Sequence, residues 1–154
     1  MRNMTNAKTP GDSETIMTEI VFPNDTNPLG ILQGGRLLHW MDIASAICAQ
    51  IHAESTAVTV SINSIQFKKP AHLGDILTIK AKITRVFNTS MEIYVEVWAR
   101  QVKKVKPALV SNAYFTFVAI DSKAKPIMVP EVKPVTTAEK REYTNALKRK
   151  NVER

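Results

Sequence analysis

Asp42 is the residue whose type and position first suggest chemistry. It is the only charged residue between Leu37 and Ile51, a stretch that otherwise reads as an apolar helix. Helical spacing puts Leu38 and Ala46 one turn away on either side, so the carboxylate loses hydration. Burying an unpaired charge costs several kcal/mol, so Asp42 must find donors, take up a proton, or mark a cavity that a ligand or water enters. Two interpretations stay open: an acid or base catalyst, or a carboxylate that accepts a hydrogen bond and only fixes the fold.

Gly34 and Gly35 precede this stretch and are expected to start the helix. Two glycines at a helix start expose backbone N–H groups that lack partners and remove the side chains that would block a ligand. The positive end of the helix dipole would favour negative charge on a carbonyl oxygen bound there. Alternatively, the pair only permits a tight turn into the helix. Seven residues separate Gly35 from Asp42, which is about 10 Å along the axis at about 1.5 Å per residue, too far for direct contact.

The elements that must position these residues follow from hydrophobic spacing. A turn-rich loop from Pro23 to Gly30 leads into one long helix, whose large apolar residues are spread around its circumference, as in a helix buried on most sides. Period-two alternation predicts five strands, at 14–22, 57–67, 76–86, 91–100 and 109–120. A phase slip predicts a bulge near Asn63 or Ser64. This order of a strand, a helix and four antiparallel strands predicts an α+β fold in which the helix crosses the concave face of the sheet.

The 154 residues suit one core domain with two short extensions. We expect a disordered N-terminal segment at 1–13, a core domain at 14–121, and a proline-containing linker with a helix at 122–154. Thr136 and Glu139 form a capping-box pattern that opens this basic C-terminal helix. The helix would serve as an oligomer contact, bind phosphate, or remain a solvated charged helix.

The net charge of +7 admits nucleic acid, an anionic membrane or a phosphate-bearing ligand as partner. Few aromatic residues lie beside the basic ones to stack bases, and no apolar run is long enough to span a membrane, so we expect neither nucleic acid nor membrane. Cys48 is the only cysteine, so no internal disulfide forms and a reducing, cytoplasmic compartment is expected. The three histidines lack ligand spacing, and no metal is predicted.

The run FPNDTNPLGILQGGRLLHWMD resembles the opening motif of the hotdog-fold acyl-CoA thioesterases. VTVSINSIQFKKPAHLGDIL and MEIYVEVWAR resemble later blocks of the same family, so the likeness covers roughly residues 14–120. The resemblance implies a hotdog fold, an antiparallel sheet wrapped around a long central helix, here followed by a basic helix. It also implies a homodimer joined edge to edge with active sites at the interface, and it leaves further assembly into a tetramer or hexamer open.

The resemblance also assigns roles. Asp42 matches the catalytic acid, a general base on water or a nucleophile toward the thioester carbonyl. Asn27 matches a loop amide expected from the partner subunit, and Gly34 or Gly35 matches the N–H donor to the carbonyl oxygen. Gln33 stands where relatives often have Phe or His. The implied reaction hydrolyses acyl-CoA to a free acid and coenzyme A and needs no cofactor, because coenzyme A belongs to the substrate.

Positive and polar residues at strand ends are candidates for binding the nucleotide phosphates of coenzyme A. They are Lys68, Lys69, Arg85, Asn88, Thr89 and Ser90. The alternative for each cation is a surface residue that maintains solubility.

Three other functions remain as alternatives. A non-catalytic acyl-CoA sensor would use the same pocket without turnover. A hotdog hydratase would need a histidine shortly after Asp42, and none follows at that spacing. A nucleic-acid binder would use the basic tail.

Overall fold

A computed structural model describes residues 7–152 of the chain. The elements, in chain order, are η2 (Pro10–Asp12), β1 (Thr15–Ile20), η3 (Pro23–Asp25), α1 (Gly34–Ala53), β2 (Ala57–Phe67), β3 (Ile76–Val86), β4 (Ser90–Arg100), β5 (Ala108–Ala119) and α2 (Thr137–Val152). The two η elements are short 3-10 turns.

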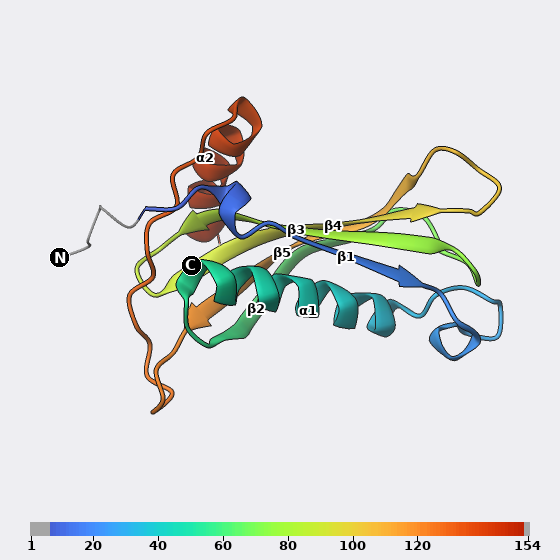
Figure 1. Cartoon of the computed structure of the whole chain (residues 1–154), viewed down its shortest axis with the longest axis horizontal. Coiled ribbons are helices and arrows are strands. Elements are labelled where there is room, and N and C mark those ends of the chain that lie inside the picture. Colours follow the sequence, from blue (N-terminus) through green and yellow to red (C-terminus); the bar gives the residue numbers. More distant parts are fainter. Residues whose placement is uncertain (1–6, 153–154) are drawn as a thin grey trace.

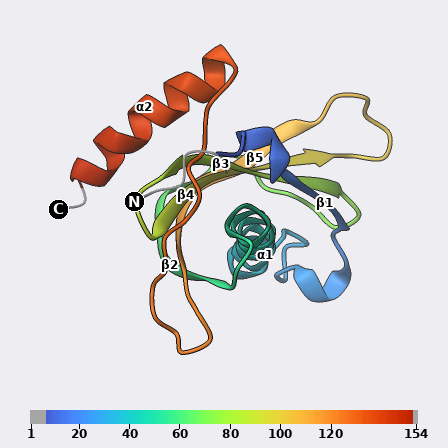
Figure 2. The ribbon, with the colours of Figure 1, turned by 60° about the vertical axis from the view of Figure 1, so that its left-hand side comes forward.

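Within these residues the strands form one antiparallel sheet in the order β1-β3-β4-β5-β2. The sheet curves around α1, which runs along its concave face (Figures 1 and 2). The predicted hotdog arrangement is therefore confirmed. Because β1 and β2 are the outer strands, each has one edge without a strand partner within residues 7–152.

The strand pattern follows the sequence closely. In β3, Leu77, Ile79 and Ala81 are fully buried against α1, while the alternate residues face the convex side. Lys80 lies opposite Glu96 in the β3–β4 hairpin, one of the cross-strand pairs expected from the alternation. The register of β2 shifts between Asn63 and Gln66, where Ser64 has a φ of 54°, which confirms the predicted bulge.

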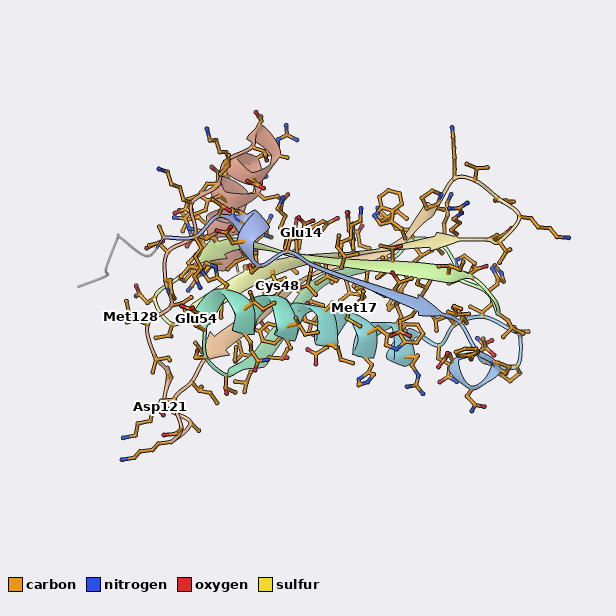
Figure 3. The ribbon with its side chains drawn as sticks, in the orientation of Figure 1. Glu14, Met17, Cys48, Glu54, Asp121 and Met128 are labelled. Atoms are coloured by element: carbon orange, nitrogen blue, oxygen red, sulfur yellow. The ribbon has the colours of Figure 1, made fainter. Side chains whose placement is uncertain are left out.

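The face of α1 that meets the sheet forms the core with strands β3, β4 and β5. Cys48 lies on this face, fully buried between the helix and the sheet (Figure 3). Small residues such as Ala44 and Ala49 are also fully buried there, so the helix backbone approaches the sheet closely. The residues of α1 buried here are Leu37, Trp40, Met41, Ala44, Ser45, Cys48, Ala49 and His52.

The opposite face of α1 is not covered within the chain, so the expectation of a helix buried on most sides is wrong for a single subunit. Ile47 is 38% exposed and Ile51 is 50% exposed. The neighbouring strand β2 likewise exposes Val58 and Val60. We call these four exposed residues, two on α1 and two on β2, the α1–β2 apolar strip, which names the set and not one continuous surface.

The N-terminal segment corrects another expectation. Residues 1–6 of the segment predicted to be disordered lie outside the described residues, but residues 7–13 have a defined conformation. The Lys8 N–H donates to Glu131 O at 3.0 Å, and Lys8 O accepts from Lys133 N at 2.7 Å. Pro10 and Ser13 are buried. Contacts with a segment more than a hundred residues later order this region, and local composition does not reveal them.

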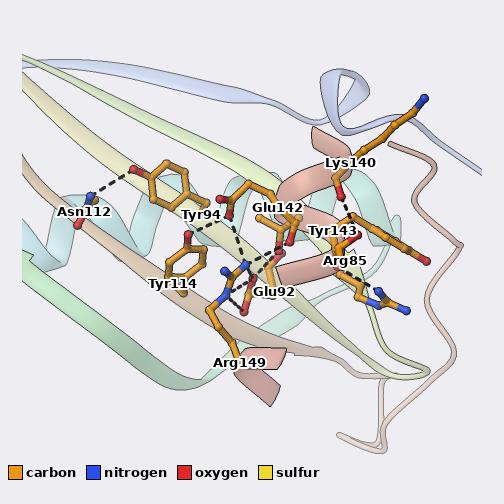
Figure 4. Close-up of polar contacts among 11 residues, drawn as sticks. Arg85, Glu92, Tyr94, Asn112, Tyr114, Lys140, Glu142, Tyr143 and Arg149 are labelled. Carbon is orange, nitrogen blue, oxygen red and sulfur yellow. Dashed lines mark hydrogen bonds and ion pairs between the residues drawn. The ribbon is translucent and has the colours of Figure 1, made fainter. Parts of the chain in front are cut away.

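The C-terminal helix α2 lies on the convex face of the sheet and is held there by polar contacts (Figure 4). The predicted capping box forms, with Glu139 N donating to Thr136 Oγ1 and Thr136 N donating to Glu139 Oε1, both at 3.1 Å. Arg149 donates several hydrogen bonds to the Glu92 carboxylate of β4, and the shortest joins Nη2 to Oε1 at 2.6 Å. The Arg149 guanidinium also lies 3.8 Å from the centroid of the Tyr114 ring. α2 is therefore a docked helix and not a solvated one.

Candidate functional site

Asp42 lies near the middle of α1 and is half-buried. Its Oδ1 accepts a hydrogen bond from the Thr59 hydroxyl at 2.6 Å, across the gap between α1 and β2. A short bond to a charged acceptor fixes the orientation of the carboxylate. Asp42 and Thr59 thus form a fixed pair that joins α1 to β2.

The sequence interpretation missed Thr59 as a site residue. The sequence placed Thr59 within a predicted strand without a role. In that strand, Val58 and Val60 point to one face of the sheet and Thr59 points to the other. A hydroxyl on the face opposite two apolar residues was the signal in the sequence that could have indicated a donor facing the helix.

The start of α1 offers free backbone donors. The helix begins at Gly34, and its first helical bond runs from Leu37 N to Gln33 O at 3.1 Å. Among the described residues, the N–H groups of Gly34, Gly35 and Arg36 have no acceptor. Such groups, together with the helix dipole, favour an anionic or polarised oxygen.

Neither glycine is required by the chain's own backbone. The positive-φ glycines of the described chain are Gly30 and Gly74, so Gly34 and Gly35 occupy conformations that other residues can adopt. A Cβ added at Gly35 would meet nothing within 4 Å, and one at Gly34 would make an ordinary contact with the Phe67 ring at 3.6 Å. The interpretation as a tight entry turn therefore loses its physical basis, and open space beside free donors remains.

Asn27 belongs to the loop that packs beside this helix start. Its Oδ1 accepts from Leu29 N at 2.9 Å and from Ile31 N at 3.1 Å, which folds the loop around the side chain. The Asn27 Nδ2 group donates to no other described residue. Gln33 Nε2 donates to Thr26 O at 3.0 Å and ties the loop to the residue before Gly34. Hydrogen bonds thus join the Asn27 loop to the start of α1.

The Asp42–Thr59 pair and the Asn27–Gly34 unit are separate within one chain. The helix starts at Gly34, so Asp42 is eight residues, or about 12 Å, along the axis at about 1.5 Å per residue. A later start, which would have shortened this separation, is not observed. A cleft of about 360 Å³ adjoins the helix start and is lined by Gly34, Leu37, Phe67, Lys68 and Lys69 among others, but Asp42 is not part of its lining.

The candidate phosphate-binding residues fall into two groups. Lys68 and Lys69 line the cleft at Gly34. Arg85 and residues 88–90 lie at the other end of β3, a strand of 11 residues, or roughly 33 Å at about 3.3 Å per residue. There Arg85 Nη1 donates to Tyr143 O at 3.0 Å, and its guanidinium lies 4.0 Å from the centroid of the Tyr143 ring. The two groups cannot contact one ligand phosphate within a single chain.

Other candidate chemistry is weaker. Burial raises the pKa of Cys48 to about 11, so the thiol is a core residue and a poor nucleophile. Between residues 7 and 152, His, Cys, Asp and Glu side chains form no group of three or more that could hold a metal ion. In the same range, no helix is long and apolar enough to span a membrane.

Comparisons with known proteins give consistent results. The sequence model of the thioesterase superfamily matches residues 29–106. An uncharacterized acyl-CoA thioester hydrolase of Bacillus subtilis is 35% identical over 140 residues, which cover 91% of this chain and 81% of that protein. The crystal structure of an apo-hexameric acyl-CoA thioesterase is 40% identical, with a TM-score of 0.92 over 94% of this chain and 93% of the other.

A third similar protein is an acyl-CoA hydrolase from Staphylococcus aureus, solved in complex with butyryl coenzyme A, coenzyme A and coenzyme A disulfide. It is 36% identical, with a TM-score of 0.90 over 96% of this chain and 90% of the other. Solved variants of that hydrolase carry alanine in place of an aspartate, an asparagine or a threonine.

Proposed function

The chain belongs to the thioesterase superfamily and hydrolyses acyl-CoA thioesters to a carboxylic acid and coenzyme A, and we propose that it does so at a site shared by two subunits. One subunit supplies Asp42 and Thr59. Its partner supplies Asn27 and the helix start at Gly34 and Gly35. The observation that carries this proposal is the separation of the two halves, about 12 Å along one helix axis at about 1.5 Å per residue, which is too long for one thioester group.

The α1–β2 apolar strip supports the dimer. Ile47 and Ile51 of α1 and Val58 and Val60 of β2 are exposed on the two elements that carry Asp42 and Thr59, and β2 has a free edge. An exposed apolar strip along an unpaired strand is a typical interaction surface. Pairing two β2 edges about a two-fold axis reverses the partner's α1, which brings its N-terminal end toward the Asp42 of the first subunit. Hexameric relatives support assembly beyond the dimer.

The chemistry follows from the two halves. The partner's free N–H groups at Gly34 and Gly35, together with its Asn27 amide, hold the thioester carbonyl oxygen and stabilise the negative charge that develops on it. Asp42, oriented by Thr59, takes a proton from water as the water oxygen bonds to the carbonyl carbon. The C–S bond then breaks and the proton passes to the coenzyme A sulfur. If Asp42 instead attacks the carbon itself, the C–S bond breaks as the mixed anhydride forms and coenzyme A leaves as a thiolate. Water then hydrolyses the anhydride, which regenerates the Asp42 carboxylate and releases the carboxylic acid, and a proton from that water passes to the thiolate.

Substrate binding uses the cleft at the helix start. Lys68 and Lys69 line this cleft and suit the phosphates of coenzyme A. Arg85, Asn88, Thr89 and Ser90 reach the same ligand only if another subunit contributes them. Neither half of the site calls for a metal or redox group, since the carboxylate, the backbone donors and water suffice for hydrolysis. Residues 14–121 form the proposed catalytic domain, and a cytoplasmic location stays a prediction that is based on the single buried cysteine.

Thiol release from a panel of acyl-CoAs tests this function. The Asp42→Ala variant should lower turnover at least about a hundredfold with little loss of coenzyme A binding, as expected for a lost general base. Glu54→Gln is a matched control, since it removes a charge that is 75% exposed at the end of the same helix. Near-normal turnover of Asp42→Ala would remove Asp42 from the mechanism. Tight binding without thiol release by the wild-type chain would favour the acyl-CoA sensor.

A further inference from the structure

The hairpin between β4 and β5 projects from the end of the sheet where α1 begins (Figure 1). Residues 101–107 of this hairpin, QVKKVKP, are all exposed. Val102 is 74% exposed and Val105 is 82% exposed, so neither side chain contributes much to the packing of the chain. Exposed apolar groups with charged residues around them are typical of an interaction site.

Three lysines flank the two valines on this hairpin. They are Lys103, Lys104 and Lys106. Among residues 7–152, no carboxylate forms an ion pair with any of the three. Lys82 on the convex face of the sheet, by contrast, pairs with Glu139 at 2.6 Å. The tip of the hairpin therefore combines aliphatic side chains with cations whose charge is not neutralised within the described chain.

The other loops at this end of the molecule do not balance the charge. The carboxylates within residues 22–31 and 68–75 are Asp25 and Asp75, which are 9% and 6% exposed. Asp25 Oδ1 lies 3.2 Å from Arg36 Nε, and Asp75 Oδ2 accepts from His72 N at 2.9 Å. Both carboxylates are thus used inside the fold, and the loops present positive charge to the solvent.

Hydrogen bonds brace the hairpin. Lys104 N donates to Gln101 O at 3.0 Å, and Arg100 Nε donates to Lys104 O at 3.1 Å. Arg100 is thus used to close the turn, while the three lysine ammonium groups point no further bond at the described chain. A braced turn presents its valines and lysines before a partner arrives, which lowers the entropy lost on binding.

The hairpin also neighbours the cleft at the helix start. Lys104 and Lys106 line a second cleft of about 290 Å³ together with Lys69 and Pro70. Lys69 and Pro70 also line the cleft at Gly34. A surface that contacts the hairpin therefore lies close to the cleft at Gly34.

We propose that the hairpin at 101–107 docks the protein on an anionic lipid membrane, with Val102 and Val105 entering the headgroup layer and the three lysines contacting lipid phosphates. The aliphatic tip favours a bilayer over nucleic acid, because sites for nucleic acid combine cations with aromatic side chains that stack on bases, and the hairpin has none. A peripheral contact needs no apolar run long enough to span a membrane, which was the ground for expecting no membrane partner.

Docking would bring the cleft at Gly34 to a surface where acyl chains collect. Long acyl chains partition into bilayers because their burial removes apolar area from water. This consequence rests on the proposed function, whereas lipid binding by the hairpin does not. A failure of thiol release would therefore leave the docking site standing, and a failure of vesicle binding would leave the hydrolysis standing.

Co-sedimentation of the full-length protein with vesicles tests the lysines. The wild-type chain should bind vesicles of phosphatidylcholine mixed with anionic phosphatidylglycerol, and added salt should weaken the binding. The variant with Lys103, Lys104 and Lys106 all changed to Gln should bind at least about a hundredfold more weakly, at about fivefold for each lysine lost near an anionic surface. The matched control changes three exposed lysines after β5, Lys123, Lys125 and Lys133, to Gln and should lose far less affinity.

The valines need a separate variant, because lysines alone would bind any polyanion. Val102→Ser/Val105→Ser keeps every charge, so affinity for the anionic vesicles should fall about tenfold at each salt concentration. Its affinity for duplex DNA should not change. Val135→Ser/Val152→Ser is the control, since these valines are 58% and 86% exposed elsewhere on the surface. In all four variants, kcat with a saturating short-chain acyl-CoA should match the wild-type value, which shows that they fold.

Absence of binding to anionic vesicles, or equal binding to vesicles of phosphatidylcholine alone, would overturn the proposal. Equal losses in the two lysine variants would show that only the overall charge matters, and would also overturn it. A valine variant that binds vesicles normally while the lysine variant loses DNA binding would point to nucleic acid instead. A valine variant with a changed oligomeric state by light scattering would identify the tip as a subunit contact and would contradict membrane docking.

Discussion

The Thr59 hydroxyl donates a 2.6 Å hydrogen bond to Asp42 Oδ1, joining the free-edged strand β2 to the middle of α1. This bond orients the one carboxylate in the apolar stretch of the helix. The second carboxylate oxygen has no partner among residues 7–152 and is available to water or substrate.

Replacing Thr59 tests whether this orientation matters for catalysis. Thr59→Val keeps the shape of the side chain but removes the donor, so kcat should fall about 10- to 100-fold, while Thr59→Ser should retain most activity. Steady-state kinetics with a saturating acyl-CoA measure the effect. Equal activity of the Val and Ser variants would show that the hydroxyl plays no part in turnover.

Gly35→Ala separates the catalytic interpretation of the glycine pair from the structural one. A Cβ there meets nothing within 4 Å in the chain, and φ is not positive, so folding should not suffer. Thermal unfolding should be unchanged or shifted slightly upward, because alanine is the better helix former. The kcat/KM should fall at least about tenfold, because the methyl group blocks the approach of a carbonyl oxygen. A variant with normal kinetics would argue against a ligand at this helix start.

A charge in the α1–β2 apolar strip should dissociate the dimer. Val60 is 55% exposed in the single chain, and burying a glutamate there in an interface would be costly. Val60→Glu should weaken self-association at least about a hundredfold and lower activity in parallel, as measured by light scattering and thiol release. Val152→Glu changes a residue that is 86% exposed at the end of α2 and serves as control. A fully active Val60→Glu monomer would contradict the shared site.

The stability of the folded protein should depend on pH through the protonation of His52. Burial lowers its pKa below the ordinary value of 6.5, although its bond to Pro130 O and the nearby Asp12 and Glu54 act in the opposite direction. Nε2 must donate to the Pro130 carbonyl at 2.8 Å, and the buried Nδ1 has no partner among residues 7–152. The unfolded chain thus binds a proton more readily than the native one. This contribution to stability is complete above the ordinary pKa of 6.5, and it is lost as the pH falls from there through the lowered pKa of His52 in the native state.

Chemical denaturation between about pH 5 and pH 7 measures the effect of this histidine, because most carboxylates do not change their charge in that range. The His52→Gln variant, whose amide can still donate to Pro130 O, should show a flatter profile than the wild-type chain. His39→Gln at an exposed position of the same helix should leave the profile unchanged. Identical slopes for the wild-type chain and His52→Gln would exclude the buried histidine as the cause.

Local patterns predicted the fold well, because period-two alternation marks a sheet that is buried on one face. The residues of β3 and β4 alternate cleanly, and the phase slip at Asn63 and Ser64 located the bulge. Long-range contacts were not predictable in this way. The bond from Thr59 to Asp42 and the order imposed on Lys8 by Glu131 depend on how distant segments meet in three dimensions.

Most residues of the candidate site were predicted from the sequence, but Thr59 was not. The residues alone indicated Asp42 and the two glycines as candidates and predicted that they lie too far apart for direct contact. Only the family resemblance indicated that Asn27 comes from a partner subunit. Because α1 starts at Gly34, a later helix start does not shorten the distance between the glycines and Asp42.

Subunit complementation tests the shared site most directly. Asp42→Ala and Asn27→Ala should each inactivate the homodimer, but mixing the two after dissociation and reassembly forms heterodimers. If Asp42 of one subunit works with Asn27 of the other, one of the two sites in each heterodimer carries no substitution, and activity should recover to about a quarter of the wild-type level. If both residues of a site come from the same chain, every site keeps one lesion. A mixture that stays inactive although heterodimers are detected would contradict the account.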